Sequence, residues 1–304
     1  MPAFQPGLVH TPVTPFTSEG RIDFDRFGKL LDFHIRNGAD ALALPTHTGE
    51  SVSLTDGEKR ALIEFAVKHV AGRKPVIAHV SDAGTAIAAG LASHAQAAGA
   101  AAILATTPYY WTPPPEMILE HFVAIGAAVR LPFLVLNAPE DMSGSKVSAE
   151  LMLKLIGRLD NFAGLVDASL DWQFMIDLIM EARHARPGFL LISGTELMVS
   201  CAAIGATAMF APLAGIAPNL MRALFELCRD DKLFEARAAQ EEVASLRQTL
   251  KAGGVASLKA ALAARGRDCG APRPPLQALD KSAAAELMPE IDAIAALRDE
   301  PSGW

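Results

Sequence analysis

The sequence has few cysteines, and no two of them lie close together. Only Cys201, Cys228 and Cys269 occur among the 304 residues, without any C-x-x-C spacing. An odd and widely spaced set of this kind supports neither a disulfide framework nor a zinc knuckle. We therefore expect a protein of a reducing compartment. With half of its 304 residues apolar, the chain can bury one large core and needs no disulfide or metal to stay folded, and we expect no cofactor.

Runs of basic residues are also missing. The chain carries 34 acidic and 27 basic side chains, which gives a net charge of -7. Proteins that follow a phosphate backbone present clustered lysines and arginines to it. Without such a cluster, we do not expect nucleic acid as a partner.

The sequence lacks an apolar segment suited to a membrane. Its first ten residues have no basic start and no sustained apolar stretch, so they do not resemble a signal peptide. The uncharged stretch 197–221 is long enough to span a bilayer, but it is rich in small residues and contains Pro212 and Pro218. We interpret it as a buried strand between two helices, and we expect a cytoplasmic protein without a membrane partner.

The chain does contain a repeated alternation of short apolar runs and helical patterns. The runs are continuously apolar, as in parallel strands buried on both faces. Eight such units predict an α/β fold, the (β/α)8 barrel, with a doubly wound open sheet as the alternative. The eight runs cover residues 8–16, 41–45, 75–80, 101–108, 132–137, 162–167, 189–193 and 206–212.

Capping residues mark the helices between the runs. Asp23 begins a helical pattern that ends at Gly38, while Thr55 and Glu58 form a capping box for a helix that ends near Gly72. Three more helical patterns follow the eighth run, at 218–251, 255–265 and 282–297. We expect residues 1–229 to form the barrel and residues 230–304 to form a C-terminal helical extension packed on it as one structural unit.

Four loops at the expected C-terminal ends of the strands carry the polar motifs, where reacting groups of such barrels lie. They read T-H-T-G-E-S at 46–51, T-P-Y-Y-W at 107–111, L-N-A-P at 136–139 and G-L-V-D-A-S at 164–169. Together with V-T-P-F at 13–16 and P-V-I-A at 75–78, these motifs resemble, in order and spacing, the dihydrodipicolinate synthase and N-acetylneuraminate lyase family.

The resemblance implies an aldolase-type lyase that works as a homotetramer or dimer on a small molecule. In this family a lysine on the sixth strand forms a Schiff base with pyruvate or a related 2-keto acid. A tyrosine at the end of the fifth strand moves protons, helped by a hydroxyl in the loop after the second strand and by a tyrosine from a neighbouring subunit. Tyr110 matches that second tyrosine, and Thr48 keeps its place.

The chain departs from the family at the positions that carry this chemistry. Val166 occupies the lysine position, Leu136 the strand-5 tyrosine position, and His47 a position where a hydroxyl is expected. Residues 140–142, Glu-Asp-Met, replace the arginine that binds the substrate carboxylate. Because valine offers no nucleophile, we predict that pyruvate forms no Schiff base here. Of the lysines considered as substitutes, Lys146, Lys154 and Lys251, only Lys146 falls near the expected mouth.

His47 and Tyr110 are the candidate catalytic residues, as acid or base, although Tyr109 and Tyr110 are equally typical of a subunit interface. His47 and His79 alone do not make a metal site, so we expect no bound metal. We expect the other polar residues of these loops to form the substrate pocket. They are Thr46, Thr48, Gly49, His79, Tyr109, Asn137, Asp141, Asp167, Ser169 and Glu196.

Several of these residues also have a simpler structural interpretation. Asp167 fits a role in tying neighbouring loops together, and we favour that role. Gly49 fits a turn with positive φ, with Glu50 anchoring the turn. Five further histidines are expected on helix or loop surfaces, namely His34, His69, His94, His121 and His184.

Three functions remain open from the sequence. The first is a lyase or hydratase on a small metabolite that needs no Schiff base and uses His47, Tyr110 and Asp167 as acid and base. The second is a catalytically inactive protein that binds a small molecule or serves as a partner subunit. The third is a purely structural oligomer.

Overall fold

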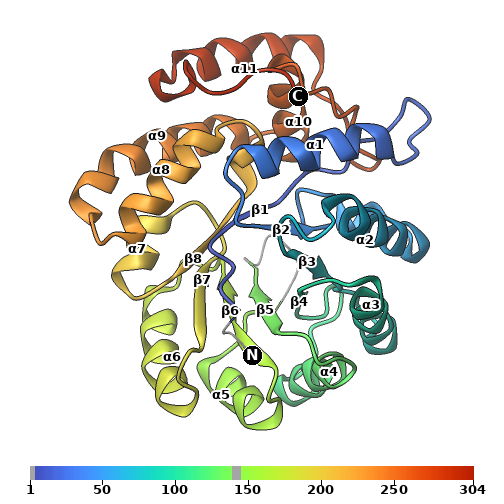
Figure 1. Ribbon diagram of the computed structural model, residues 1–304, viewed down its shortest axis with the longest axis vertical. Coiled ribbons are helices and arrows are strands. Elements are labelled where there is room, and N and C mark those ends of the chain that lie inside the picture. Colours follow the sequence, from blue (N-terminus) through green and yellow to red (C-terminus); the bar gives the residue numbers. More distant parts are fainter. Residues whose placement is uncertain (1–3, 139–144) are drawn as a thin grey trace.

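The structure is a computed structural model that describes residues 4–138 and 145–304. Its parallel strands close into a barrel in chain order, with the first strand paired to the last (Figure 1). This closed ring confirms the (β/α)8 barrel and excludes the open sheet. The strands are β1 (Leu8–His10), β2 (Ala41–Leu44), β3 (Val76–His79), β4 (Ala102–Thr106), β5 (Phe133–Asn137), β6 (Phe162–Asp167), β7 (Leu190–Ser193) and β8 (Ala208–Ala211).

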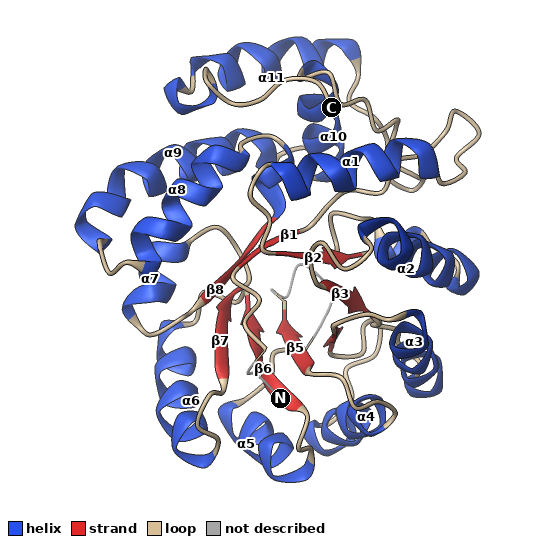
Figure 2. Ribbon diagram, viewed as in Figure 1, coloured by secondary structure: helices blue, strands red, loops and turns tan. Residues whose placement is uncertain are grey.

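Helices surround the ring, one after each strand (Figure 2). They are α1 (Phe24–Arg36), α2 (Asp56–Val70), α3 (Thr85–Ala98), α4 (Pro115–Ala127), α5 (Ala149–Arg158), α6 (Trp172–Ala185), α7 (Met198–Ala203) and α8 (Pro218–Arg229). The short helix η1 (Ser51–Ser53) precedes α2, and η3 (Pro212–Gly215) precedes α8. Both caps expected from the sequence are present: the Asp23 side chain accepts from the Arg26 amide, and Thr55 and Glu58 form a capping box.

The interior of the barrel is filled with side chains rather than open. Alternate strand residues point inward and form one apolar cluster, and Phe4 from the N-terminal segment packs against it. The cluster consists of Val9, Ala41, Ala43, Ile77, Ala102, Leu104, Leu134, Val166, Leu190, Ile192, Ala208 and Phe210. A filled interior leaves the ends of the strands as the place for a ligand.

The chain after the barrel forms three helices, α9 (Leu233–Lys251), α10 (Val255–Ala264) and α11 (Lys281–Ala293), followed by η4 (Ala295–Leu297). They lie together on the side of the ring that carries α1 and α8 (Figure 1). The prediction of a single helix over 218–251 was wrong, because α8 and α9 divide that range. The chain turns after Arg229, and Asp231 takes a left-handed conformation with φ of 58°. The division at residue 229 into barrel and extension remains a prediction.

The uncharged stretch 197–221 contains α7, β8, η3 and the start of α8, so it is indeed a buried strand between helices. The first apolar run is mostly loop, since β1 ends at His10. Within the described part of the chain, none of the helices has both the length and the apolar character required to cross a bilayer.

Candidate functional site

A cavity of about 390 Å³ lies at the C-terminal ends of β2 to β5. Among its described lining residues there is no aspartate, glutamate, lysine or arginine. The lining combines hydroxyl and imidazole groups with hydrocarbon, and so suits the uncharged part of a small molecule. It consists of His47, Ser51, Val52, His79, Ser81, Thr106, Tyr109, Tyr110, Leu136 and Ala138.

Hydrocarbon side chains form the side of this cavity that faces the barrel interior. Leu136 lines the cavity and packs against the inner cluster, and its neighbour in the β5–β6 register is Val166. Val166 is fully buried within that cluster. Where the family resemblance implies a tyrosine and a lysine, two apolar side chains therefore lie side by side.

Two residues of the third strand and its loop, His79 and Ser81, bring polar atoms to the cavity. The Ser81 hydroxyl lies 2.8 Å from Nε2 of His79 and accepts a 2.8 Å hydrogen bond from the Thr106 amide. A hydrogen bond with the Pro45 backbone, which has only a carbonyl to offer, also acts on the His79 ring, so the ring is the donor in that bond. Ser81 is not among the pocket residues predicted from the sequence, although its position two residues after His79 places both side chains on the same face.

Burial keeps the His79 ring neutral. Desolvation lowers its pKa to about 4, and the nearby Lys59 and His47 act in the same direction, while the bond to Pro45 opposes them. When the single proton of the neutral ring is on Nδ1, Nε2 is the acceptor and the Ser81 hydroxyl is the donor. The His79 ring is therefore neutral, and able to accept a proton, at neutral pH.

Tyr109 and Tyr110 lie at the cavity in different environments. Tyr109 is half-buried, and burial raises its pKa, as does the charge of Asp82, while a hydrogen bond from the Ala83 backbone opposes them. Tyr110 is 85% exposed, has φ of 73° and packs its ring edge-on against Trp111. Tyr110 thus lies at the rim with His47, which is also exposed.

The loop 46–51 holds His47 in place through its neighbours. Thr46 and Thr48 hydrogen-bond to each other at 3.1 Å, and Thr48 donates to the Thr11 carbonyl at 3.1 Å. Neither threonine lines the cavity described above. Their hydroxyls are therefore used within the protein, joining the ends of β1 and β2.

The glycine of this loop is needed for close packing rather than for its φ angle, which corrects the sequence interpretation. The left-handed residue is Glu50, with φ of 55°. A Cβ on Gly49 would lie 3.3 Å from the Pro45 Cα and 3.3 Å from Thr14 Oγ1, so a side chain there would crowd both neighbours. Thr14 donates to the Gly49 carbonyl at 2.7 Å and fixes this approach.

Glu50 anchors the loop to the C-terminal extension. Its carboxylate lies 2.6 Å from Nζ of Lys259 on α10 and accepts a 2.7 Å hydrogen bond from the Arg273 amide. Lys259 and Arg273 both lie over the Phe16 ring, at 4.3 and 4.4 Å from its centroid. The extension thereby positions a loop that lines the cavity.

The remaining predicted pocket residues tie loops together outside the cavity. Asn137 donates to the Asp167 carboxylate at 2.6 Å, and Ser169 donates to it at 2.9 Å. Glu196 is fully buried, accepts from the Leu213 amide at 2.9 Å and pairs with Arg247 at 3.2 Å. Burial raises the pKa of both Asp167 and Glu196. Asp141 lies outside the described residues.

Two of the five histidines expected at the surface are buried, which corrects that expectation. His34 faces His10, with their Nδ1 atoms 3.0 Å apart, in the layer between β1 and the helices. His121 is buried on α4 and bonds to Thr85 at 2.9 Å. Over residues 4–138 and 145–304, no three His, Cys, Asp or Glu side chains gather as metal ligands.

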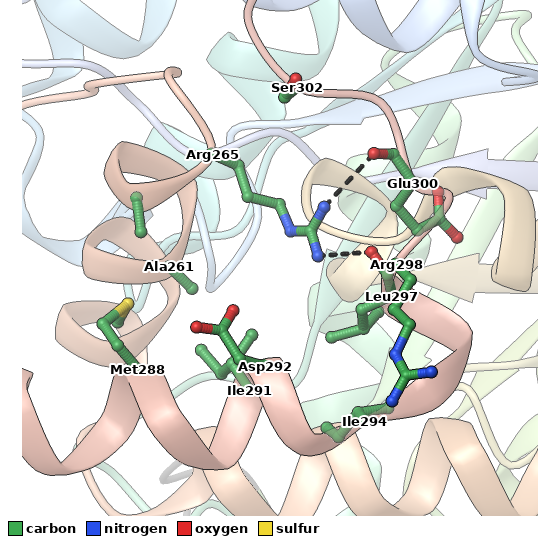
Figure 3. A pocket seen from close by; sticks show the side chains of 11 residues that line it. Ala261, Arg265, Met288, Ile291, Asp292, Ile294, Leu297, Arg298, Glu300 and Ser302 are labelled. Carbon is green, nitrogen blue, oxygen red and sulfur yellow. Dashed lines mark hydrogen bonds between the residues drawn. The ribbon is translucent and has the colours of Figure 1, made fainter.

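A second hollow, of about 320 Å³, lies within the C-terminal extension (Figure 3). Arg265 spans it and donates to the carbonyls of Leu297 and Glu300 at 2.7 and 3.3 Å. This guanidinium is occupied in holding the last residues of the chain against α10. None of the described residues that line this hollow comes from the end of a strand, in contrast to the cavity at the ends of β2 to β5.

Comparison with known proteins identifies one family to which the chain is similar. Residues 5–294 match the profile of the dihydrodipicolinate synthetase family. A 4-hydroxy-tetrahydrodipicolinate synthase of Bacillus subtilis is 31% identical over 93% of this chain and 97% of its own length. One from Azoarcus sp. is 36% identical over 73% of this chain and 74% of its own length.

The fold comparison agrees with the sequence comparison. A prophage protein of the dihydrodipicolinic acid synthase family from E. coli K12, solved in complex with pyruvate, superposes with a TM-score of 0.89 at 25% identity. The superposition covers 96% of this chain and 98% of that protein. The C-terminal helices are therefore part of the shared architecture.

Proposed function

The chain belongs to the dihydrodipicolinate synthetase family, and we propose that it is an aldolase-type member that works without a Schiff base to pyruvate. The observation that carries this proposal is the pair of Leu136, which lines the cavity, and Val166, its neighbour in the β5–β6 register within the inner cluster. An imine needs a primary amine in contact with the substrate carbonyl. Two hydrocarbon side chains supply none.

The positions of the described lysines support the same proposal. Lys59 and Lys259 are buried, but each is paired with a carboxylate, Asp82 at 3.4 Å and Glu50 at 2.6 Å. Lys146 is exposed in the chain segment before α5, and no lysine belongs to the described lining of the cavity. A lysine engaged in an ion pair with a carboxylate is a poor nucleophile.

The uncharged lining supports a substrate other than pyruvate. A small carboxylate is normally bound by arginine or by several donors, and the described lining contains no arginine or lysine. The imidazoles and hydroxyls of His47, His79 and Tyr110 instead provide acid and base groups around a neutral carbonyl compound. The proposed reaction is a lyase or hydratase step on such a compound.

A direct assay tests this proposal. We expect the protein to give no condensation of pyruvate with aspartate semialdehyde above background, because no imine forms to activate pyruvate. The B. subtilis synthase, assayed at the same concentration, is the positive control. Turnover within about tenfold of that control would show that the proposal is wrong, since tenfold corresponds to only about 1.4 kcal/mol in the barrier.

A further inference from the structure

The Ser81 hydroxyl has one hydrogen-bonding position left for a ligand. A hydroxyl carries one hydrogen and two lone pairs. In the tautomer with the proton on Nδ1, the Ser81 hydrogen points to Nε2 of His79, 2.8 Å away, and one lone pair of Ser81 accepts from the Thr106 amide at 2.8 Å. Ser81 and His79 both line the cavity, so the second lone pair is the part of this chain of bonds that a ligand can reach.

Thr106, whose amide donates to Ser81, also carries a hydroxyl that can donate a hydrogen bond. Oγ1 of Thr106 is buried and has no partner among the described residues, although Thr106 lines the same cavity. A buried hydroxyl without a partner is costly, and a ligand oxygen placed against it would remove that cost. The cavity thus offers a ligand two groups: the Ser81 oxygen as an acceptor, itself bonded to His79, and Oγ1 of Thr106 on β4 as a donor.

We propose that Ser81 and His79 form a proton relay that cleaves a neutral β-hydroxy carbonyl compound, with Thr106 Oγ1 donating to the carbonyl oxygen. This inference rests on the proposed function, because it supplies the proton transfer that a reaction without an imine still needs. The positions involved are distinct from the lysine and tyrosine positions of the family resemblance. In this relay the Pro45 carbonyl, which hydrogen-bonds to the His79 ring, would hold the proton of the ring on Nδ1.

The step balances without any further reactant. The substrate hydroxyl gives its proton to Ser81 Oγ while Ser81 passes its own proton to Nε2 of His79. The bond between the carbinol carbon and the α-carbon breaks, the carbinol oxygen becomes a carbonyl, and the electron pair forms an enolate against Thr106. The proton then returns from His79 through Ser81 to the α-carbon, which leaves two carbonyl products and the unchanged relay.

The charge of the lining defines the substrate class. No described lining residue is acidic or basic apart from the two histidines, so a phosphate or carboxylate near the relay would lie in the cavity without a counter-ion. The hydrocarbon of Leu136 and Ala138 faces the same space. A small, uncharged hydroxy ketone or hydroxy aldehyde fits both features.

The probe we would use is 4-hydroxy-4-methylpentan-2-one, whose cleavage to two molecules of acetone is followed by proton NMR. We expect cleavage by the unmodified protein, a loss of about 100-fold or more in kcat for Ser81→Ala with KM little changed, and recovery in Ser81→Thr. His79→Asn should lose activity to a similar extent. Ser93→Ala, which changes an exposed serine on α3, is the matched control.

A second measurement does not depend on turnover. Nitrogen-15 NMR of the histidine rings should show His79 protonated at Nδ1, with an Nε2 resonance that moves in Ser81→Ala and not in Ser93→Ala. Absence of this tautomer, or cleavage of the probe no faster than by Ser81→Ala, would overturn the relay. That result would leave the proposed function intact, because only catalysis or adduct formation with pyruvate contradicts it.

Discussion

Replacing Glu50 with glutamine should lower the free energy of unfolding by about 3 to 5 kcal/mol, the usual cost of removing one partner of a buried ion pair. Glu50 and Lys259 are 2% and 3% exposed, and their charged atoms are 2.6 Å apart. Burial lowers the pKa of Lys259, and Glu50 opposes that effect. Glutamine keeps the shape of the side chain but leaves a buried cation without a counter-charge.

The double variant Glu50→Gln with Lys259→Met should recover much of this loss, because the uncompensated charge is then absent. Urea unfolding of the unmodified protein, the two single variants and the double variant gives the coupling free energy between Glu50 and Lys259. Glu150→Gln is the matched control, since Glu150 forms an exposed pair with Lys154 at 2.7 Å and exposed pairs contribute little to stability. Equal losses for Glu50→Gln and Glu150→Gln would show that the loop is not anchored by this pair.

Acidification below pH 6.5 should destabilise the protein through its buried histidines. Burial lowers the pKa of His34 to about 3 and that of His79 to about 4, and it places the pKa of His10 well below the usual value. Neighbouring cations act in the same direction, namely Arg267 at His34, Lys59 at His79, and Arg222 and Lys74 at His10.

The direction of this pH effect on stability follows from proton uptake by the unfolded chain. Unfolded histidines take up protons near pH 6.5, whereas the folded ones stay neutral until the pH approaches 4 or 3. Stability is therefore full above pH 6.5 and falls as the pH decreases toward the folded values. At about 1.4 kcal/mol for each tenfold difference in proton affinity, His34 and His79 should each cost roughly 3 kcal/mol by pH 4.

Comparison with a variant isolates this effect from the carboxylates, some of which act in the opposite direction. Burial raises the pKa of Asp167, Glu196 and Glu300, so protonation of these carboxyl groups on acidification stabilises the folded protein. His34→Gln removes one titrating ring, and its urea midpoint should fall less than that of the unmodified protein between pH 7 and pH 4. The exposed His184→Gln should behave like the unmodified protein, and the explanation fails if all three lose the same stability.

The barrel and its order of strands were readable from the sequence because parallel strands buried on both faces are continuously apolar. The caps at Asp23 and Thr55 were equally clear, since each needs only residues adjacent in the chain. The break between α8 and α9 was not, because a helical pattern of apolar residues continues across Asp231 and only the left-handed turn there interrupts it.

The site was readable in part. His47, His79, Tyr109 and Tyr110 do line the cavity, because the ends of adjacent parallel strands meet. Asn137, Asp167 and Glu196 bond instead to loops and helices far along the chain, and such pairings leave no local pattern. The burial of His34 is of the same kind, because it depends on His10 from another element.

The proposed absence of a Schiff base is tested most directly by intact-mass analysis after incubation with pyruvate and borohydride. We expect no adduct on the unmodified protein and an adduct on Val166→Lys, whose amine would extend from β6 toward the cavity beside Leu136. Val166→Met, similar in length but without an amine, is the control and should stay unmodified. An adduct on the unmodified protein would mean that another lysine reacts with pyruvate, and the proposal of a mechanism without a Schiff base would be wrong.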